Sequence, residues 1–367
     1  MTLSAGERRD RLRLARTDGV GPVAFANLLG RFGSAERALQ RLPELAKRAG
    51  RIDPLSTPST ARADEEMEAG AAIGARLIVF GEASYPPLLA QVDPPPPLLW
   101  VLGDAALLSR AAVGVVGARV ASAAGQRFAR ELASRLGQAG LVVASGMARG
   151  VDGAAHEGAL PTGTVAVLGG GVNDVYPPEH AELYARLTEH GAVVSESRVG
   201  HRAQARDFPR RNRLISGLSR AVVVVEAEVR SGSLITARLA AEQGREVFAV
   251  PGSPLDPRAK GCNDLIRQGA HLCEGADDVL RVLESLPGLG EPEGPRFVGA
   301  GMDEAALERE ADRVRGRVEA LLSPTPTPRD EFVRLTGAPA PAVFAALTEL
   351  ALAGRAELLS GGLVVRA

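Results

Sequence analysis

The fold and the candidate site are both decided by one stretch, residues 208–237, FPRRNRLISGLSRAVVVVEAEVRSGSLITA. The stretch begins with cationic residues, continues into the β-branched run 222–225, and ends in the small-residue turn 231–233, which opens an amphipathic helical pattern. An unbroken β-branched run predicts a strand that is buried on both faces. The first amides of a helix have no intrahelical partner, so together with nearby guanidinium groups they predict an anion site, most simply a phosphate site.

The order of strand, glycine-rich turn and helix repeats on both sides of this stretch. Strands that alternate with helices in this way predict an α/β fold with a parallel, doubly wound sheet, whose ligands bind outside the carboxyl ends of the strands. A further short strand is predicted at 75–80. The predicted core strands are 112–118, 141–145, 164–169, 192–196, 221–227 and 246–252. The rim at their carboxyl ends carries small residues and two arginines, including Gly117, Arg119, Ser145, Gly146, Arg149, Ser231, Gly232 and Ser233.

Patterns of a different kind flank this core, which we place at 75–288. Residues 1–74 are predicted to be helical, with a Gly-Val-Gly turn at 19–21 that resembles a helix-hairpin-helix. Such a turn either meets a DNA phosphate or simply joins two helices that contact protein. The composition of 287–302 predicts a flexible linker, and we place the linker between the two domains at 289–302. Three helical patterns and two short strands in 303–367 then predict a winged helix, whose third helical pattern carries a single charge, Glu349, and therefore favours protein contacts over DNA reading.

Composition excludes an argument from global charge, because the net charge of the 367-residue chain is −1. Polyanion binding must therefore come from local patches. Lys47 and Lys260 are the only lysines, so nearly all positive charge is arginine. The two cysteines and five histidines form no metal-ligand spacing, and we expect neither a metal nor a cofactor. The N-terminus lacks the apolar segment of a signal peptide, and no apolar run reaches the ~18 residues of a membrane span, so we expect a cytoplasmic protein without membrane contact.

Familiar catalytic motifs are absent from the sequence. The dinucleotide fingerprint, the Walker A loop and the G-x-S-x-G elbow do not occur. A hydrolytic set could be assembled from Ser145, Asp152 and His156, but Asp152 is better interpreted as the N-cap of the following helix. Glu196 and Glu226 each end a strand and could do acid–base chemistry, although we interpret them as structural partners of arginines. The sequence therefore favours a binding protein over an enzyme.

Six arginines lie between residues 198 and 213, against one acid, Asp207. This cationic segment, interpreted as a loop, carries one aromatic residue, Phe208. Single-stranded nucleic acid needs such a combination, a cationic track for phosphates and a ring that stacks on a base. The alternative for Phe208 is a core anchor that holds the loop before Pro209.

The sequence resembles the bacterial DNA-processing protein A (DprA/Smf) family in segments that cover about the middle half of the chain, in the family's order. The resemblance implies an extended Rossmann-like core that binds single-stranded DNA without catalysis, forms a homodimer and loads RecA in natural transformation. It also implies an N-terminal domain of the sterile-alpha-motif-like or helix-hairpin-helix type and a C-terminal winged helix. The matching segments are VGVVGAR (113–119), VASGMARGVDGAAHEGAL (143–160), TVAVLGGGVNDVYPPEH (164–180), SE (195–196), residues 208–237, and GREVFAVPGSPLDPRAKGCNDLIRQGAHL (244–272).

The resemblance also implies roles for particular residues. Arg119 matches the family's DNA-contacting arginine, and the turn 231–233 matches its phosphate-holding pocket. Some members have a DNA-contacting lysine after the Tyr-Pro motif, where this chain has Glu179, so that contact would need a nearby arginine instead. Phe208, Arg210, Arg211, Asn212 and Arg213 match the basic, base-contacting segment, and Leu265, Ile266 and Leu272 fall on the expected dimer and RecA surface.

Three hypotheses remain open at this point. The first is a single-stranded DNA-binding protein that delivers its strand to RecA, with double-strand binding undecided. The second is a nucleotide-hydrolysing enzyme on a Rossmann-like fold, with Glu226 or Glu196 as its acid. The third is a pure protein adaptor that dimerises through residues 255–285.

Overall fold

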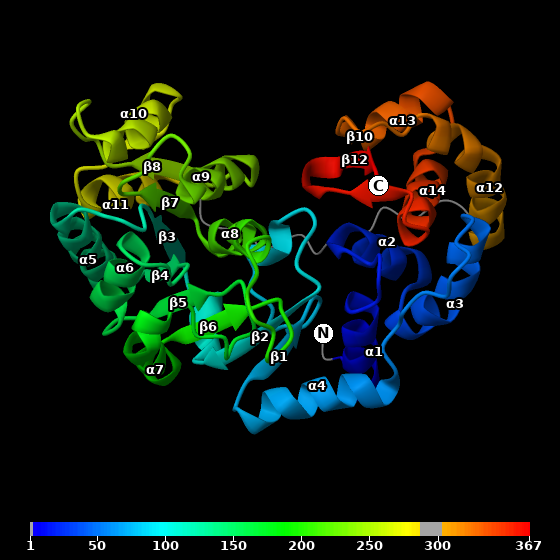
Figure 1. Ribbon diagram of the computed structural model, residues 1–367, viewed down its shortest axis with the longest axis horizontal. Coiled ribbons are helices and arrows are strands. Elements are labelled where there is room, and N and C mark those ends of the chain that lie inside the picture. The colour runs from blue at the N-terminus through cyan, green and yellow to red at the C-terminus, as the bar shows by residue number, and fades with distance from the viewer. Residues whose placement is uncertain (1–2, 287–302) are drawn as a thin grey trace.

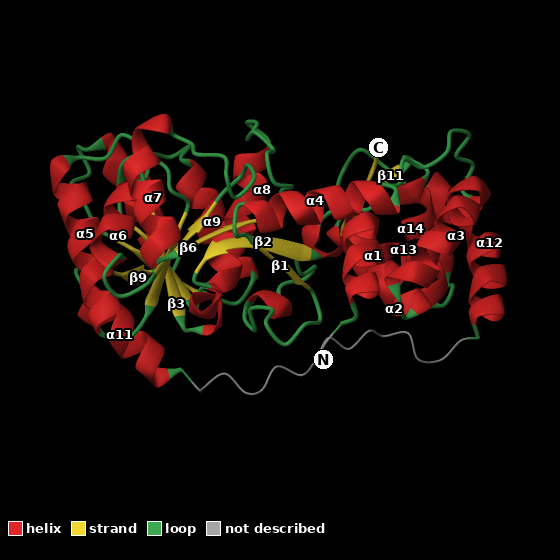
Figure 2. Ribbon diagram, turned by 90° about the horizontal axis from the view of Figure 1, so that it is seen from below, coloured by secondary structure: helices red, strands yellow, loops and turns green. Residues whose placement is uncertain are grey.

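The computed structural model describes residues 3–286 and 303–367, which form two lobes (Figure 1). One lobe is the α/β core. The other combines the N-terminal helices with the C-terminal domain, so these two domains, which are far apart in the sequence, lie side by side (Figures 1 and 2). The predicted linker at 287–302 lies outside the described residues.

The N-terminal part is helical, as predicted. Serine N-caps begin three of its four helices, because the hydroxyl of Ser4, Ser34 or Ser59 accepts a hydrogen bond from an amide in the first turn. The exception is the second helix, which begins with Pro22 directly after Gly21 and follows the predicted Gly-Val-Gly turn. The helices are α1 (Ala5–Ala15), α2 (Pro22–Phe32), α3 (Ala35–Arg48) and α4 (Thr60–Ala72).

The core is built on a nine-stranded sheet in the order β1-β2-β6-β5-β4-β3-β7-β8-β9. Strands β3 to β9 are parallel, as predicted, whereas β1 and β2 form an antiparallel edge next to β6. The sequence interpretation missed β2 because its apolar run directly follows the proline-rich segment 93–97. The strands are β1 (Arg76–Val79), β2 (Leu98–Gly103), β3 (Ala112–Val116), β4 (Val142–Ser145), β5 (Thr164–Val167), β6 (Ala192–Ser195), β7 (Ala221–Val224), β8 (Glu246–Ala249) and β9 (His271–Leu272).

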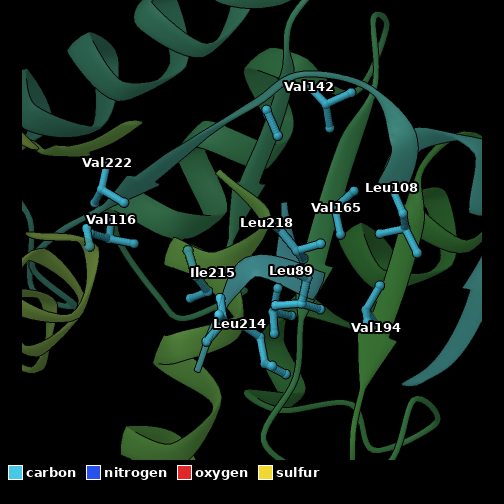
Figure 3. Packing of buried hydrophobic residues seen from close by; sticks show 14 of the residues in the cluster. Leu89, Leu108, Val116, Val142, Val165, Val194, Leu214, Ile215, Leu218 and Val222 are labelled. Carbon is cyan, nitrogen blue, oxygen red and sulfur yellow. The ribbon is translucent and has the colours of Figure 1, made fainter. Parts of the chain in front are cut away.

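Helices cover both faces of the parallel part, which explains the unbroken apolar runs. Val222 and Val224 face one cluster with α8 and α9 (Figure 3), while Ala221 and Val223 face another with α5, α6 and α11. The core helices are α5 (Ala123–Gln138), α6 (Val151–Ala159), α7 (Ala181–His190), α8 (Asp207–Leu218), α9 (Gly232–Glu242), α10 (Lys260–Arg267) and α11 (Ala276–Ser285).

The cationic segment expected to be a loop is helix α8. Pro209 lies in the first turn, where a missing amide costs no hydrogen bond. Leu214, Ile215 and Leu218 then recur at helical spacing and pack against the sheet (Figure 3). The loop interpretation was wrong because proline and arginine obscured this apolar periodicity.

The C-terminal domain is the predicted winged helix. Its third helix, α14, packs against the N-terminal helices as well as against α12, and Leu352 belongs to the N-terminal apolar cluster. No single described helix has the length and apolarity of a membrane span; α13 and α14 reach it only together, across a 120° bend. The elements are α12 (Glu304–Ala320), β10 (Thr327–Pro328), α13 (Arg329–Thr336), α14 (Ala340–Leu352), β11 (Ala356–Leu358) and β12 (Leu363–Arg366).

Candidate nucleic-acid interface

An exposed cluster of one arginine and two aromatic rings lies at the carboxyl ends of the parallel strands. The guanidinium carbon of Arg119, just after β3, lies 5.5 Å from the centroid of the Phe208 ring in α8. The centroid of the Tyr176 ring lies 5.5 Å from that of Phe208, and the two ring planes make an angle of 46°. Arg119 is exposed, Tyr176 is 50% exposed and Phe208 is half-buried. We call Arg119, Phe208 and Tyr176 the rim cluster.

The rim cluster joins segments that are far apart in the sequence. Tyr176 was not predicted, although a tyrosine in a glycine-rich segment after a strand was a usable signal. An open guanidinium beside two partly exposed rings can pair with a phosphate and stack on bases at the same time.

Arg211 lies beneath this surface rather than on it. Its side chain is buried, and its guanidinium donates hydrogen bonds to the carbonyl oxygens of Gly146, at 2.7 Å, and Val167, and to the Asn212 side chain, at 3.1 Å. The prediction that Arg211 is a surface phosphate contact therefore needs correction: it fixes α8 to the ends of β4 and β5. A Cβ atom on Gly146 would lie 2.3 Å from this guanidinium, so only glycine leaves room for it.

Burial shifts the pKa values of Arg211 and Asp152, two charged side chains that lie beneath the surface. It lowers the pKa of Arg211 to about 10, although Asp152 opposes the shift, so Arg211 stays a cation at neutral pH. Burial also raises the pKa of Asp152, against Arg211 and the amides of Ala148 and Gly146. Asp152 accepts those two amides at 3.3 and 3.1 Å. It is thus not the N-cap of α6, which is Gly150, but holds the preceding turn from the first turn of the helix.

The imagined hydrolytic set is not assembled. Ser145 is fully buried, and its hydroxyl donates to the carbonyl oxygen of Val115 at 2.6 Å. His156 is also fully buried and bonds through Nδ1 to the Thr164 hydroxyl at 2.7 Å. Burial, with smaller contributions from His180 and Arg211, lowers the pKa of His156 to about 3, so it is neutral.

The remaining predicted cations differ in how free they are. Arg210 is exposed and has no ion-pair partner among the described residues. Arg213 is largely buried and paired with Glu196. Arg149 is paired with Glu179, both more than half exposed, and an exposed pair of this kind contributes little to stability and exchanges readily. Arg149 therefore compensates the acid that replaces the lysine of some family members.

The turn 231–233 and residue Asn212 lie at the junction of α8 and α9. Ser231 is the N-cap of α9: its hydroxyl accepts from the amide of Ser233 at 3.3 Å and contacts the Ser233 hydroxyl at 2.7 Å. Asn212, also buried, donates from Nδ2 to the Gly232 carbonyl oxygen at 3.3 Å. Asn212 therefore positions the turn.

Glu226 occupies the position where a Rossmann-type fold would hold a nucleotide phosphate. Its carboxylate accepts the amide of Ser122 at 2.9 Å and the Ser122 hydroxyl at 2.5 Å, and Ser122 is the N-cap of α5. The N-terminal end of α5, which follows β3 and is where such a phosphate would bind, is thus occupied by the carboxylate of Glu226.

The residues expected at a dimer surface lie at the far edge of the sheet. Leu265 and Ile266 in α10 are partly buried against the core. Leu272 is 46% exposed on β9, an edge strand.

Both cysteines are free and buried, and burial raises the pKa of each thiol to about 12. Among residues 3–286 and 303–367, no three His, Cys, Asp or Glu side chains are placed to hold a metal ion.

Fold and site together define a three-domain protein: a mostly parallel α/β core with an arginine–aromatic rim, a helical N-terminal domain and a winged helix. The chain belongs to the DprA/Smf family. The family described as DNA recombination-mediator protein A matches residues 76–284, the DprA-like N-terminal HHH domain matches 5–69, and the DprA winged helix domain matches 302–362.

Individual relatives agree with this assignment. Protein Smf of Escherichia coli is 41% identical over 292 residues, which are 78% of this chain and 76% of that protein. The X-ray structure of DprA from Streptococcus pneumoniae superposes with a TM-score of 0.62 at 31% identity, over 77% of this chain and 98% of that one. The DNA processing protein A of Helicobacter pylori, whose structure was described for its single-stranded DNA binding mode, gives a TM-score of 0.53 at 27% identity, over 58% and 96%.

Proposed function

We propose that this protein binds single-stranded DNA on the rim cluster and, as a homodimer in the cytoplasm, loads RecA onto the bound strand during recombination, including natural transformation. The observation that carries the proposal is the open Arg119 guanidinium beside the Phe208 ring, which in turn contacts the Tyr176 ring. A single strand offers unpaired bases to the rings and phosphates to the guanidinium, whereas a duplex keeps its bases stacked. The relative from Helicobacter pylori, named for its single-stranded DNA binding mode, supports the same ligand.

The proposed function contains no catalytic step. The two candidate acids already have partners, Glu226 in Ser122 and Glu196 in Arg213. These bonds support a structural role for both carboxylates over acid–base chemistry on a nucleotide. The RecA and homodimer parts of the proposal rest on family membership and on the exposed edge strand β9 with Leu272. Sedimentation at micromolar concentration tests the dimer, which a Leu272→Arg variant should weaken.

A binding titration tests the main claim. Labelled single-stranded oligonucleotide is titrated with the wild type and with Arg119→Gln/Phe208→Ala at several salt concentrations. We expect the wild-type log–log salt slope to lie near −3 to −4, as for about four to six neutralised phosphates. The double variant should bind much more weakly, while Arg281→Gln, an exposed arginine on α11, should bind as the wild type does. Equal affinity of wild type and double variant would rule the proposal out.

A further inference from the structure

A second cationic site lies on the other side of α8 from the rim cluster. A cleft of about 350 Å³ is lined by residues of the core and of the N-terminal domain. The core wall includes the segment between β6 and α8, the first turns of α8, and residues 97–98 and 168–169. The opposite wall includes Val20, Gly21 and Pro22, the turn between α1 and α2.

Three arginines in the core wall form no ion pair with a described residue. Arg198, Arg206 and Arg210 are exposed, line the cleft, and have neither an ion pair nor a side-chain hydrogen bond with another described residue. The other two arginines that line the cleft are engaged: Arg16, at the end of α1, is bonded to Glu66 at 2.9 Å and to the carbonyl oxygen of Glu196 at 3.0 Å, and Arg211 is buried. The cleft therefore presents three free guanidinium groups from one short segment.

The two acids in the cleft are paired with other side chains. Glu196 is paired with Arg213. Asp207 accepts hydrogen bonds from the His201 ring at 2.9 Å and from the Gln204 amide at 2.9 Å. Burial alone would raise the pKa of Asp207, but the Gln204 amide, His201 and, as the smallest cause, the nearby charge of Arg206 bring the pKa below its ordinary value. Both carboxylates are thus engaged within the protein.

The cleft is separate from the rim cluster yet adjacent to it. Arg119, Tyr176 and Phe208 do not line the cleft, whereas Asp207 and Arg210 on α8 do. Two residues along a helix correspond to a rotation of about 200°, so Phe208 and Arg210 point to opposite sides of the same turn. A strand that leaves the rim cluster over the N-terminal end of α8 would enter the cleft directly.

The N-terminal wall is also suited to a phosphate. Gly21 is the N-cap of α2, and the first amides of that helix have no intrahelical acceptor. They add a partial positive charge opposite the arginines. A Cβ atom at Gly21 would meet nothing within 4 Å, so this part of the wall is open.

We propose that this cleft is a second phosphate-binding site, which holds the backbone of the same DNA strand after it leaves the rim cluster, with the N-terminal domain as its far wall. The inference rests on the proposed function, because it extends the path of the bound strand. It makes the N-terminal domain part of the DNA-binding site. A free phosphate group has the same chemistry as the strand's backbone, so the test must separate the two sources.

The core wall is tested with oligonucleotides of increasing length and the full chain. The variants are Arg198→Gln/Arg206→Gln and, as matched control, Arg202→Gln, which removes an exposed arginine of the same segment that does not line the cleft. For long oligonucleotides the double variant should flatten the salt slope by about 1.4, or about 0.7 per lost phosphate contact. Short oligonucleotides that fill only the rim cluster should bind to the double variant as tightly as they bind to the wild type. If the affinity of the double variant depends on oligonucleotide length and on salt in the same way as that of Arg202→Gln, the second site is ruled out.

The far wall is tested by Gly21→Glu against Gly21→Gln, which differ only in charge. The glutamate variant should bind long oligonucleotides several-fold more weakly than the glutamine variant, while equal binding overturns the role of the N-terminal domain.

Calorimetry with inorganic phosphate distinguishes a site for free phosphate from a site for the DNA backbone. If Arg198→Gln/Arg206→Gln loses phosphate binding but binds long oligonucleotides as the wild type does, the DNA path is ruled out. Failure of the wild type to bind any oligonucleotide removes the proposed function itself, whereas loss of binding only in Arg119→Gln/Phe208→Ala removes the second site alone.

Discussion

Phe208 and Arg211 are three residues apart in one helix and have opposite roles. Phe208 lies at the surface between Arg119 and Tyr176, while Arg211 lies underneath, bonded to two backbone carbonyls. The sequence located the cationic segment but could not separate surface from buried arginines, because that depends on the phase of α8 against the sheet. The residue types were predictable, and their directions were not.

Truncation of the Phe208 ring distinguishes base stacking from a core anchor. Because stacking contributes about 1–3 kcal/mol per base, Phe208→Ala should weaken single-stranded DNA binding by roughly 5-fold to 150-fold. Thermal unfolding should change little, since the ring is half-buried at the surface. A variant that binds normally but melts at a clearly lower temperature would identify Phe208 as an anchor instead.

Substitution of Arg211 should act on stability first. In Arg211→Gln the carbonyl oxygens of Gly146 and Val167 lose their cationic donor, which should lower the free energy of unfolding by roughly 2–4 kcal/mol. Arg210→Gln, one residue away and exposed, serves as the control and should unfold like the wild type. Chemical denaturation measures both. If Arg211→Gln is as stable as the wild type, Arg211 does not hold α8 in place, and the prediction of a DNA contact would stand again.

At the scale of elements, periodicity predicted most of the fold. The six parallel core strands were recognisable because two-sided burial makes them continuous apolar runs. The antiparallel strand β2 was missed, since its position depends on pairing with β1 and β6, which are distant in the chain. Helix α8 was missed because its apolar face is only visible once the sheet that it covers is known.

The buried His156, which joins α6 to β5 through its hydrogen bond with Thr164, makes the stability of the protein depend on pH. His156 has a pKa of about 3 in the folded protein, below its ordinary 6.5, so the unfolded chain binds an extra proton between these values. Stability should therefore fall as the pH drops from 6.5 towards 3, and at pH 5 this residue should account for about 2 kcal/mol. His156→Gln should show a shallower decline between pH 7 and 5 in denaturant titrations. Parallel curves for the two proteins would contradict this assignment.

At the scale of the whole molecule, the winged helix is docked onto the N-terminal domain through its third helix. Glu349 in α14 is fully buried and pairs with Arg31, at 3.1 Å, and with Arg315. Asn27 donates to the Thr348 hydroxyl at 3.0 Å. The lone charge that argued against a DNA-reading helix is thus an interdomain ion pair, a role that the sequence could not show because its partner Arg31 is more than 300 residues away.

Removal of Glu349 should loosen this docking. Glu349→Ala leaves two guanidinium groups without their buried acid, which should cost about 3–5 kcal/mol. We expect a lower melting temperature and faster proteolytic release of the C-terminal domain. Glu357→Ala, an exposed acid of the same domain, is the matched control. If both variants resist proteolysis like the wild type, the docked arrangement does not persist in solution.

Photocrosslinking tests the central claim most directly. A single-stranded oligonucleotide with photoreactive bases is irradiated in complex with the full chain, and the crosslinked residues are identified by mass spectrometry. We predict that the bases crosslink to Phe208 and Tyr176, because these two rings contact each other and the open guanidinium of Arg119 lies against Phe208. Crosslinks confined to the winged helix, with none at the rim cluster, would contradict it.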